Sequence, residues 1–163
     1  GAALAFNTTF VLAVDIDDAA LSATRANAEM NGVAEKLRFR SGLDAAGVCE
    51  VVDPATCNLV ISDCEGFELE VFSDAAIEAL RNSYCLIECH DHLGRDVVGT
   101  LTSRFRESHD VIEFAAGERD LSEHSFLGTL HGFDRWVATF ENRPEGMRWL
   151  FARPIGVSSP APR

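Results

Sequence analysis

Short apolar runs that alternate with helix-forming segments are the feature that most restricts the fold of this chain. The clearest run spans 10–14 and is followed directly by Asp15. A continuous apolar run of this length is typical of a parallel strand that is buried on both faces. The same criteria predict further strands at 37–40, 58–62, 84–88, 111–114 and 147–151.

Helices are predicted between these strands. Asp17 is a suitable N-cap and Asn31 with Gly32 is a suitable stop, so one helix is expected between them. Another begins at Ser73 or Asp74. Apolar side chains at three- and four-residue steps predict two more helices, over 97–105 and 127–140. Strands that alternate with helices in this way predict a doubly wound, mostly parallel α/β sheet.

The length of 163 residues suits one compact domain. We expect this domain to cover 1–153 and the Pro- and Ser-containing segment 154–163 to be a disordered tail. The apolar segment 1–14 has no basic leading residues and runs into acidic ones, so a signal peptide is not predicted.

Charge and cysteine content exclude several classes of protein. The formal net charge is -12, from 14 basic and 26 acidic residues, which disfavours binding to nucleic acid or to anionic lipid. No apolar run approaches the roughly 20 residues of a membrane helix. The five cysteines form no Cys-x-x-Cys pair, so neither a disulfide framework nor a structural zinc site is predicted. These features favour a cytoplasmic protein, and they leave its oligomeric state open.

The predicted fold also selects residues for a binding site. In doubly wound sheets, ligands bind beyond the carboxyl ends of the strands. The residues at those ends are Asp15, the turn near Asp44, the segment 63–68 and the segment 88–92.

Two segments resemble a known family. The strand 12–17 and the Ala-rich helix after it, which closes on Asn31-Gly32-Val33, resemble the second strand and helix of class I S-adenosylmethionine-dependent methyltransferases. The resemblance implies that Asp15 binds the ribose hydroxyls of S-adenosylmethionine, since one carboxylate can accept from both. Asp44 and Asp63, after later strands, complete the predicted cofactor-binding set.

The second segment is Ser-Asp-Cys-Glu-Gly-Phe-Glu at 62–68, which resembles the Asp-x-Glu-Gly-x-Glu element of FkbM-like methyltransferases. The strand at 86–90, the segment 141–144 and Trp149 also resemble that family. The resemblance implies a Rossmann-like methyltransferase fold and O-methylation of a small-molecule or glycan hydroxyl.

One part of the family pattern is not found. The acidic residue of the second strand normally follows a glycine-rich turn by about 20 residues, and only fourteen residues precede Asp15. We therefore expect an N-terminally incomplete fold that lacks the first strand and the glycine loop and binds S-adenosylmethionine weakly. Two alternatives stay open: a truncated, non-catalytic remnant that acts through protein contacts, and an NAD-type oxidoreductase whose ribose is held by Asp15.

The catalytic residues are predicted at the ends of the fourth and fifth family strands. Asp63 and Glu65 are expected to face Glu88 and His90 in one pocket. Glu65 or His90 is the predicted base, Asp63 orients donor or acceptor, and Glu88 holds His90 in one tautomer. Glu68 is interpreted as a first-turn helix residue that the helix dipole favours.

Glu88, His90, Asp91 and His92 together offer oxygen and nitrogen ligands for a metal. Clusters of this kind at strand ends are more often hydrogen-bonded turns, and methyl transfer does not require a metal. No metal is therefore predicted.

Overall fold

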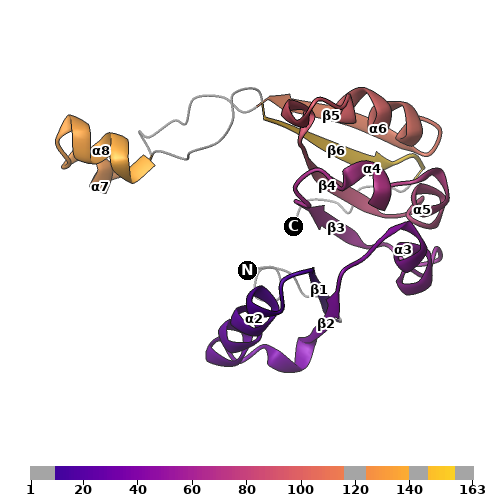
Figure 1. Cartoon of the computed structure of the whole chain (residues 1–163), viewed down its shortest axis with the longest axis horizontal. Coiled ribbons are helices and arrows are strands. Elements are labelled where there is room, and N and C mark those ends of the chain that lie inside the picture. The colour runs from indigo at the N-terminus through magenta and orange to yellow at the C-terminus, as the bar shows by residue number, and fades with distance from the viewer. Residues whose placement is uncertain (1–9, 116–123, 140–146, 157–163) are drawn as a thin grey trace. The chain divides into compact units, whose positions relative to one another are not determined.

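The computed structural model describes residues 10–115, 124–139 and 147–156. The chain divides into two compact units, Gly1–Val52 and Asp53–Arg163. Each unit is described by itself, and Figure 1 shows the elements of both.

The first unit is built on two parallel strands, β1 (Val11–Asp15) and β2 (Leu37–Ser41), paired from Val11 opposite Leu37 to Asp15 opposite Ser41. Helix α2 (Asp18–Met30) connects them, followed by the short 3-10 helix η1 (Ala34–Lys36). Helix α3 (Ala45–Val51) follows β2. The unit is therefore a β-α-β arrangement with one additional helix.

Local sequence explains the ends of these helices. Asp17 is the N-cap of α2, and its side chain accepts a hydrogen bond from Ala19 N at 2.8 Å. The chain leaves α2 through Asn31 and through Gly32, whose φ of 66° suits glycine. Arg25 of α2 lies over the ring of Phe39 of β2, with its guanidinium carbon 4.2 Å from the ring centroid. This contact fastens the helix to the sheet.

The second unit contains a four-stranded sheet in the order β3-β4-β6-β5. Its strands are β3 (Leu59–Ser62), β4 (Tyr84–Cys89), β5 (His109–Ala115) and β6 (Arg148–Pro154). Its helical segments are α4 (Glu68–Val71), α5 (Asp74–Ala79), η2 (Asp91–Leu93), α6 (Val97–Phe105), α7 (Ser125–Gly128) and α8 (Gly132–Thr139).

The sheet is parallel where β3 meets β4 and antiparallel on both sides of β6. Strand β6 lies between β4 and β5, so Phe151 is opposite both Leu86 and Ile112. The predicted α/β class with parallel pairing is confirmed, and β6 is the strand that reverses direction.

The core of the second unit lies between one sheet face and the helices. Cys85, Ile87 and Cys89, at alternate positions of β4, are fully buried together with Leu101 and Phe105 of α6. Leu150 and Ala152 of β6 are buried opposite Ile87 and Cys85. Other buried residues, in or next to the helices, are Phe72, Ile77, Leu80 and Val97. Strand β3, first in the sheet order of the described residues, leaves Leu59 and Ile61 48% and 58% exposed.

The predicted helix at 127–140 is two short helices in the structure, α7 and α8. Arg135 of α8 donates from Nε to the carbonyl of Leu127 of α7 at 2.8 Å, which holds the two together. Phe140 lies outside the described residues, as does most of the predicted tail. Pro154, where that tail was predicted to begin, is the last residue of β6. None of the helices in the described part of the chain has the length and apolar character that a membrane crossing requires.

The buried His109 makes the stability of the second unit sensitive to acid. Burial lowers the pKa of His109. Its Nε2–H donates to the carbonyl of Ser83 (3.0 Å), and its Nδ1 accepts from Ser108 Oγ (2.8 Å). Because its pKa is lower in the folded than in the unfolded chain, the unfolded chain binds more protons below about pH 6.5. The contribution of His109 to stability is therefore complete above that pH and is lost as the pH falls toward the folded pKa.

We accordingly expect the free energy of unfolding to fall between pH 7 and pH 5, and His109→Gln to reduce that pH dependence. Urea denaturation at several pH values measures it. His124→Gln is the matched control, because His124 is exposed. An equal pH dependence in the parent and in His109→Gln would contradict the assignment.

Candidate functional site

The candidate site lies where β3 and β4 end side by side. The two strands are parallel neighbours, with Ser62 opposite Ile87 at the carboxyl end. The chain after β3 forms a loop over 63–67 before α4, and the chain after β4 passes through His90 into η2. The topology therefore brings the loop and His90 to one edge of the sheet.

The loop holds a conformation that depends on Gly66. Glu65 has a φ of 51° and Gly66 a φ of 99°, both in the left-handed region. A Cβ atom at Gly66 would lie 2.6 Å from Cδ1 of Leu93, so only glycine fits there without a shift of Leu93. Arg95 donates from Nη1 to the carbonyl of Gly66 at 3.3 Å and also pairs with Glu70 at 2.9 Å. These contacts fasten the loop to the segment after β4.

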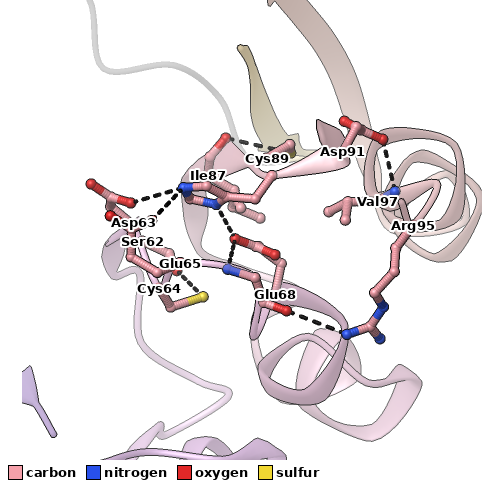
Figure 2. A network of polar contacts seen from close by, with 12 residues as sticks. Ser62, Asp63, Cys64, Glu65, Glu68, Ile87, Cys89, Asp91, Arg95 and Val97 are labelled. Atoms are coloured by element: carbon pink, nitrogen blue, oxygen red, sulfur yellow. Dashed lines mark hydrogen bonds and ion pairs between the residues drawn. The ribbon is translucent and has the colours of Figure 1, made fainter. Parts of the chain in front are cut away.

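His90 is the centre of the site. Figure 2 shows the network of polar contacts to which Asp63, Glu65 and Glu68 belong. Its side chain is only 3% exposed. Nε2 lies 3.2 Å from Oε2 of Glu65 and 3.6 Å from Oδ1 of Asp63. Asp63 and Glu65 are themselves 50% and 84% exposed. The site thus has a buried imidazole whose outer nitrogen faces two carboxylates at the surface.

The inner nitrogen of His90 contacts Glu68. Oε1 of Glu68 meets Nδ1 of His90 and also accepts a hydrogen bond from Gly66 N at 3.0 Å. A carboxylate only accepts, so Nδ1 carries a proton in this contact, and Nε2 is the ring nitrogen that faces Asp63 and Glu65. Oε2 of Glu68 is buried and has no hydrogen-bond partner.

Behind this cluster, Asp91 fixes the start of α6. Its Oδ1 accepts from Val97 N at 2.9 Å and from Val98 N at 3.3 Å, and Oδ2 lies 3.3 Å from Nη2 of Arg148. The Asp91 side chain thus takes part in a hydrogen-bonded turn, the arrangement that the sequence analysis favoured over a metal site for these residues. The side chain of His92 is outside the described residues.

Three of the four predicted catalytic residues meet in the structure. Asp63, Glu65 and His90 offer ligand atoms that all lie within 4.8 Å of one another. Glu88 is buried in β4, where it pairs in register with Trp149 of β6. The contact at Nδ1 of His90 is made by Glu68, so the orienting role predicted for Glu88 is filled there by a different carboxylate.

The predicted cofactor residues Asp15 and Asp44 belong to the first unit. Asp15 is exposed at the carboxyl end of β1, and its Oδ1 accepts from Asp17 N at 2.9 Å. That bond fixes the carboxylate in one orientation. Asp44 is the N-cap of α3, with Oδ1 accepting from Gly47 N at 2.8 Å, a structural use of its side chain.

Glu68 is the site residue whose role the sequence prediction missed. It lies in the first turn of α4, as expected, but its side chain is fully buried. The signal was its spacing from Phe72: residues four apart share one helix face, and Phe72 is fully buried. Cys64, in the same loop as Asp63 and Glu65, is half-buried, and burial raises the pKa of its thiol.

Comparisons with known proteins find similarity to methyltransferases. A family model for ribosomal protein L11 methyltransferases (PrmA) matches residues 2–64. Among solved structures, a domain from Corynebacterium diphtheriae, provisionally assigned as a precorrin-6Y C5,15-methyltransferase, matches with a TM-score of 0.51 and 12% identity, over 93% of this chain and 77% of that chain. No match was found among curated proteins.

The structural match shows a methyltransferase fold of the Rossmann-like type. Together, the two comparisons support a class I S-adenosylmethionine-dependent methyltransferase at the general level. The family match runs from before β1 to Cys64, so it ends inside the loop that carries Asp63 and Glu65.

The buried Glu68 should contribute to stability as well as to the geometry of the site. In Glu68→Ala, the N–H of Gly66 and Nδ1 of His90 lose their acceptor inside the protein, which costs about 1–3 kcal/mol. We expect urea denaturation to show a loss of that size. Glu70→Ala, in the same helix but half-exposed, should change stability by less than about 0.5 kcal/mol. Equal losses for the two variants would show that the Glu68 contact is not stabilising.

Proposed function

We propose that this protein transfers a methyl group from S-adenosylmethionine to a hydroxyl of a small molecule or glycan, as the FkbM-like resemblance implies. The observation that carries the proposal is the meeting of Asp63, Glu65 and His90 beside the carboxyl ends of two parallel strands in a methyltransferase fold. This is the edge of the sheet at which ligands bind in doubly wound folds.

The residues proposed for the cofactor are Asp15, Asp44 and Asp63. Asp15 fits a ribose best, because it is an exposed carboxylate at the end of β1 whose orientation Asp17 N already fixes. Asp44 would have to bind the cofactor while its Oδ1 caps α3. Asp63, in the second unit, is half-exposed at the end of β3.

The acceptor hydroxyl is proposed to lie against Glu65 and His90. S-adenosylmethionine supplies an electrophilic methyl carbon: the acceptor oxygen bonds to it while the carbon–sulfur bond breaks and leaves its electron pair on sulfur. The hydroxyl proton passes to Oε of Glu65 or to Nε2 of His90. Glu68 supports His90 in this role, because its contact at Nδ1 orients the ring and stabilises the charge the ring would gain.

The cofactor half of the proposal is tested at Asp15. We expect Asp15→Ala to weaken S-adenosylmethionine binding roughly 10- to 100-fold, the scale of a hydrogen bond to a charged group. Calorimetry should be done with this chain and with the longest encoded protein that contains it. Asp18→Ala is the matched control, since Asp18 is exposed in the first turn of α2 and is not at the strand end. Equal affinities for Asp15→Ala and the parent would remove Asp15 from the site.

The acceptor half is tested at Glu65 and His90. Each of Glu65→Gln and His90→Ala should lower kcat by roughly 10²-fold or more, which is the usual loss for a general base. Formation of S-adenosylhomocysteine with a panel of glycan and small-molecule hydroxyls measures turnover, and calorimetry checks that cofactor binding is retained. Parent-like turnover in both variants would refute the assignment, and absence of turnover in the parent with every acceptor would refute the proposed activity.

A further inference from the structure

We propose that Asp63, Glu65 and His90 form a binding site for one divalent transition-metal cation of the Mn²⁺ type. The sequence analysis predicted no metal because it considered the run 88–92. The structure brings together a different set, drawn from the loop after β3 and from the end of β4. The proposal concerns cation binding and holds without the proposed function.

Two of the separations between donor atoms are close to those around one cation, and the three atoms all lie within 4.8 Å of one another. Ligand atoms about 2.0–2.2 Å from a metal lie roughly 3 to 3.5 Å from one another when the angles at the metal are 90–110°. Nε2 of His90 is 3.2 Å from Oε2 of Glu65 and 3.6 Å from Oδ1 of Asp63. Two carboxylate oxygens and one imidazole nitrogen suit Mn²⁺ and its first-row neighbours better than Mg²⁺, which prefers oxygen ligands alone.

Glu68 gives His90 the support that metal-bound histidines have. A ligating histidine almost always donates its other ring N–H to a carboxylate or carbonyl, which fixes the tautomer and raises the basicity of the ligating nitrogen. Glu68 makes that contact at Nδ1 from a fully buried position. The ring is thereby oriented with Nε2 on the side of Asp63 and Glu65.

The charge around His90 also favours a cation. Three carboxylates surround one imidazole, and the ion pairs that the structure shows for Asp63, Glu65 and Glu68 within the described residues are all with His90. Oε2 of Glu68 is buried without a hydrogen-bond partner. This is an independent sign that the negative charge of Glu68 is not fully balanced by hydrogen bonds or positive charge. A divalent cation at Nε2 would supply positive charge that a single imidazolium cannot match.

A bound cation would also limit which group accepts the proton of the acceptor hydroxyl. This consequence, unlike cation binding, rests on the proposed function. The lone pair of Nε2 cannot serve a cation and a proton at once. With the cation in place, the proton of the acceptor hydroxyl passes to the second oxygen of Glu65, and the charge of the cation favours its release.

The experiment is titration of chelator-treated protein with Mn²⁺, followed by electron paramagnetic resonance of the free ion, without S-adenosylmethionine or acceptor. We expect one Mn²⁺ per chain. Asp63→Asn, Glu65→Gln and His90→Ala should each weaken binding at least 10-fold, and Glu68→Gln should weaken it 10- to 100-fold through His90. Glu70→Gln is the control and should bind like the parent, because Glu70 pairs with Arg95 outside the cluster.

Glu65→Gln decides the result if the buried variants do not fold, because Glu65 is 84% exposed. The proposal is overturned by absence of Mn²⁺ binding in the millimolar range, or by equal binding in the parent and in Glu65→Gln. In that case Asp63, Glu65 and His90 form a network of polar contacts that holds the loop and no cation. The readout contains no turnover, so loss of the proposed methyl transfer leaves the cation result unaffected.

Discussion

The buried contact between Glu68 and His90 is the interaction on which the site depends. Both side chains are buried, and a buried carboxylate or imidazolium without a partner costs several kcal/mol. Together they fix the ring of His90 and the entry of the chain into α4. Because the ring is held in one orientation, the surface carboxylates of Asp63 and Glu65 both face its Nε2.

Much of the fold could be predicted because its local signals are strong. The apolar run before Asp15, the cap at Asp17 and the run at 58–62 gave strands and a helix close to those of the structure. Helices α3 and α4 were missed because each has at most seven residues, too few for helical periodicity to show. The reversal of β6 was also missed, because strand direction depends on pairing between distant residues and not on local pattern.

The site was predictable in part for the same reason. Asp63, Glu65 and His90 lie at strand ends, and the rule that ligands bind there needs only the order of strands and helices. The choice between Glu88 and Glu68 as the support of His90 needed three-dimensional information. Glu88 is two residues from His90 along β4, whereas Glu68 reaches it from a helix 22 positions away in the chain.

The loop over 63–67 shows how the fold accommodates a conformation that is locally unfavourable. Glu65 has a positive φ, which costs a non-glycine residue of order 1 kcal/mol, and the φ of 99° at Gly66 is one that side-chain-bearing residues rarely adopt. Three contacts offset that cost: Gly66 N to Glu68, the Gly66 carbonyl to Arg95, and Glu65 to His90. Without such contacts an exposed turn would relax to an unstrained conformation. The contacts that hold the backbone at Glu65 also direct its carboxylate toward Nε2 of His90. The backbone strain at Glu65, the buried pair of Glu68 and His90, and the orientation of the surface carboxylates thus depend on one another. Loss of the Glu68 contact would remove the acceptor of Gly66 N and the support of the His90 ring together.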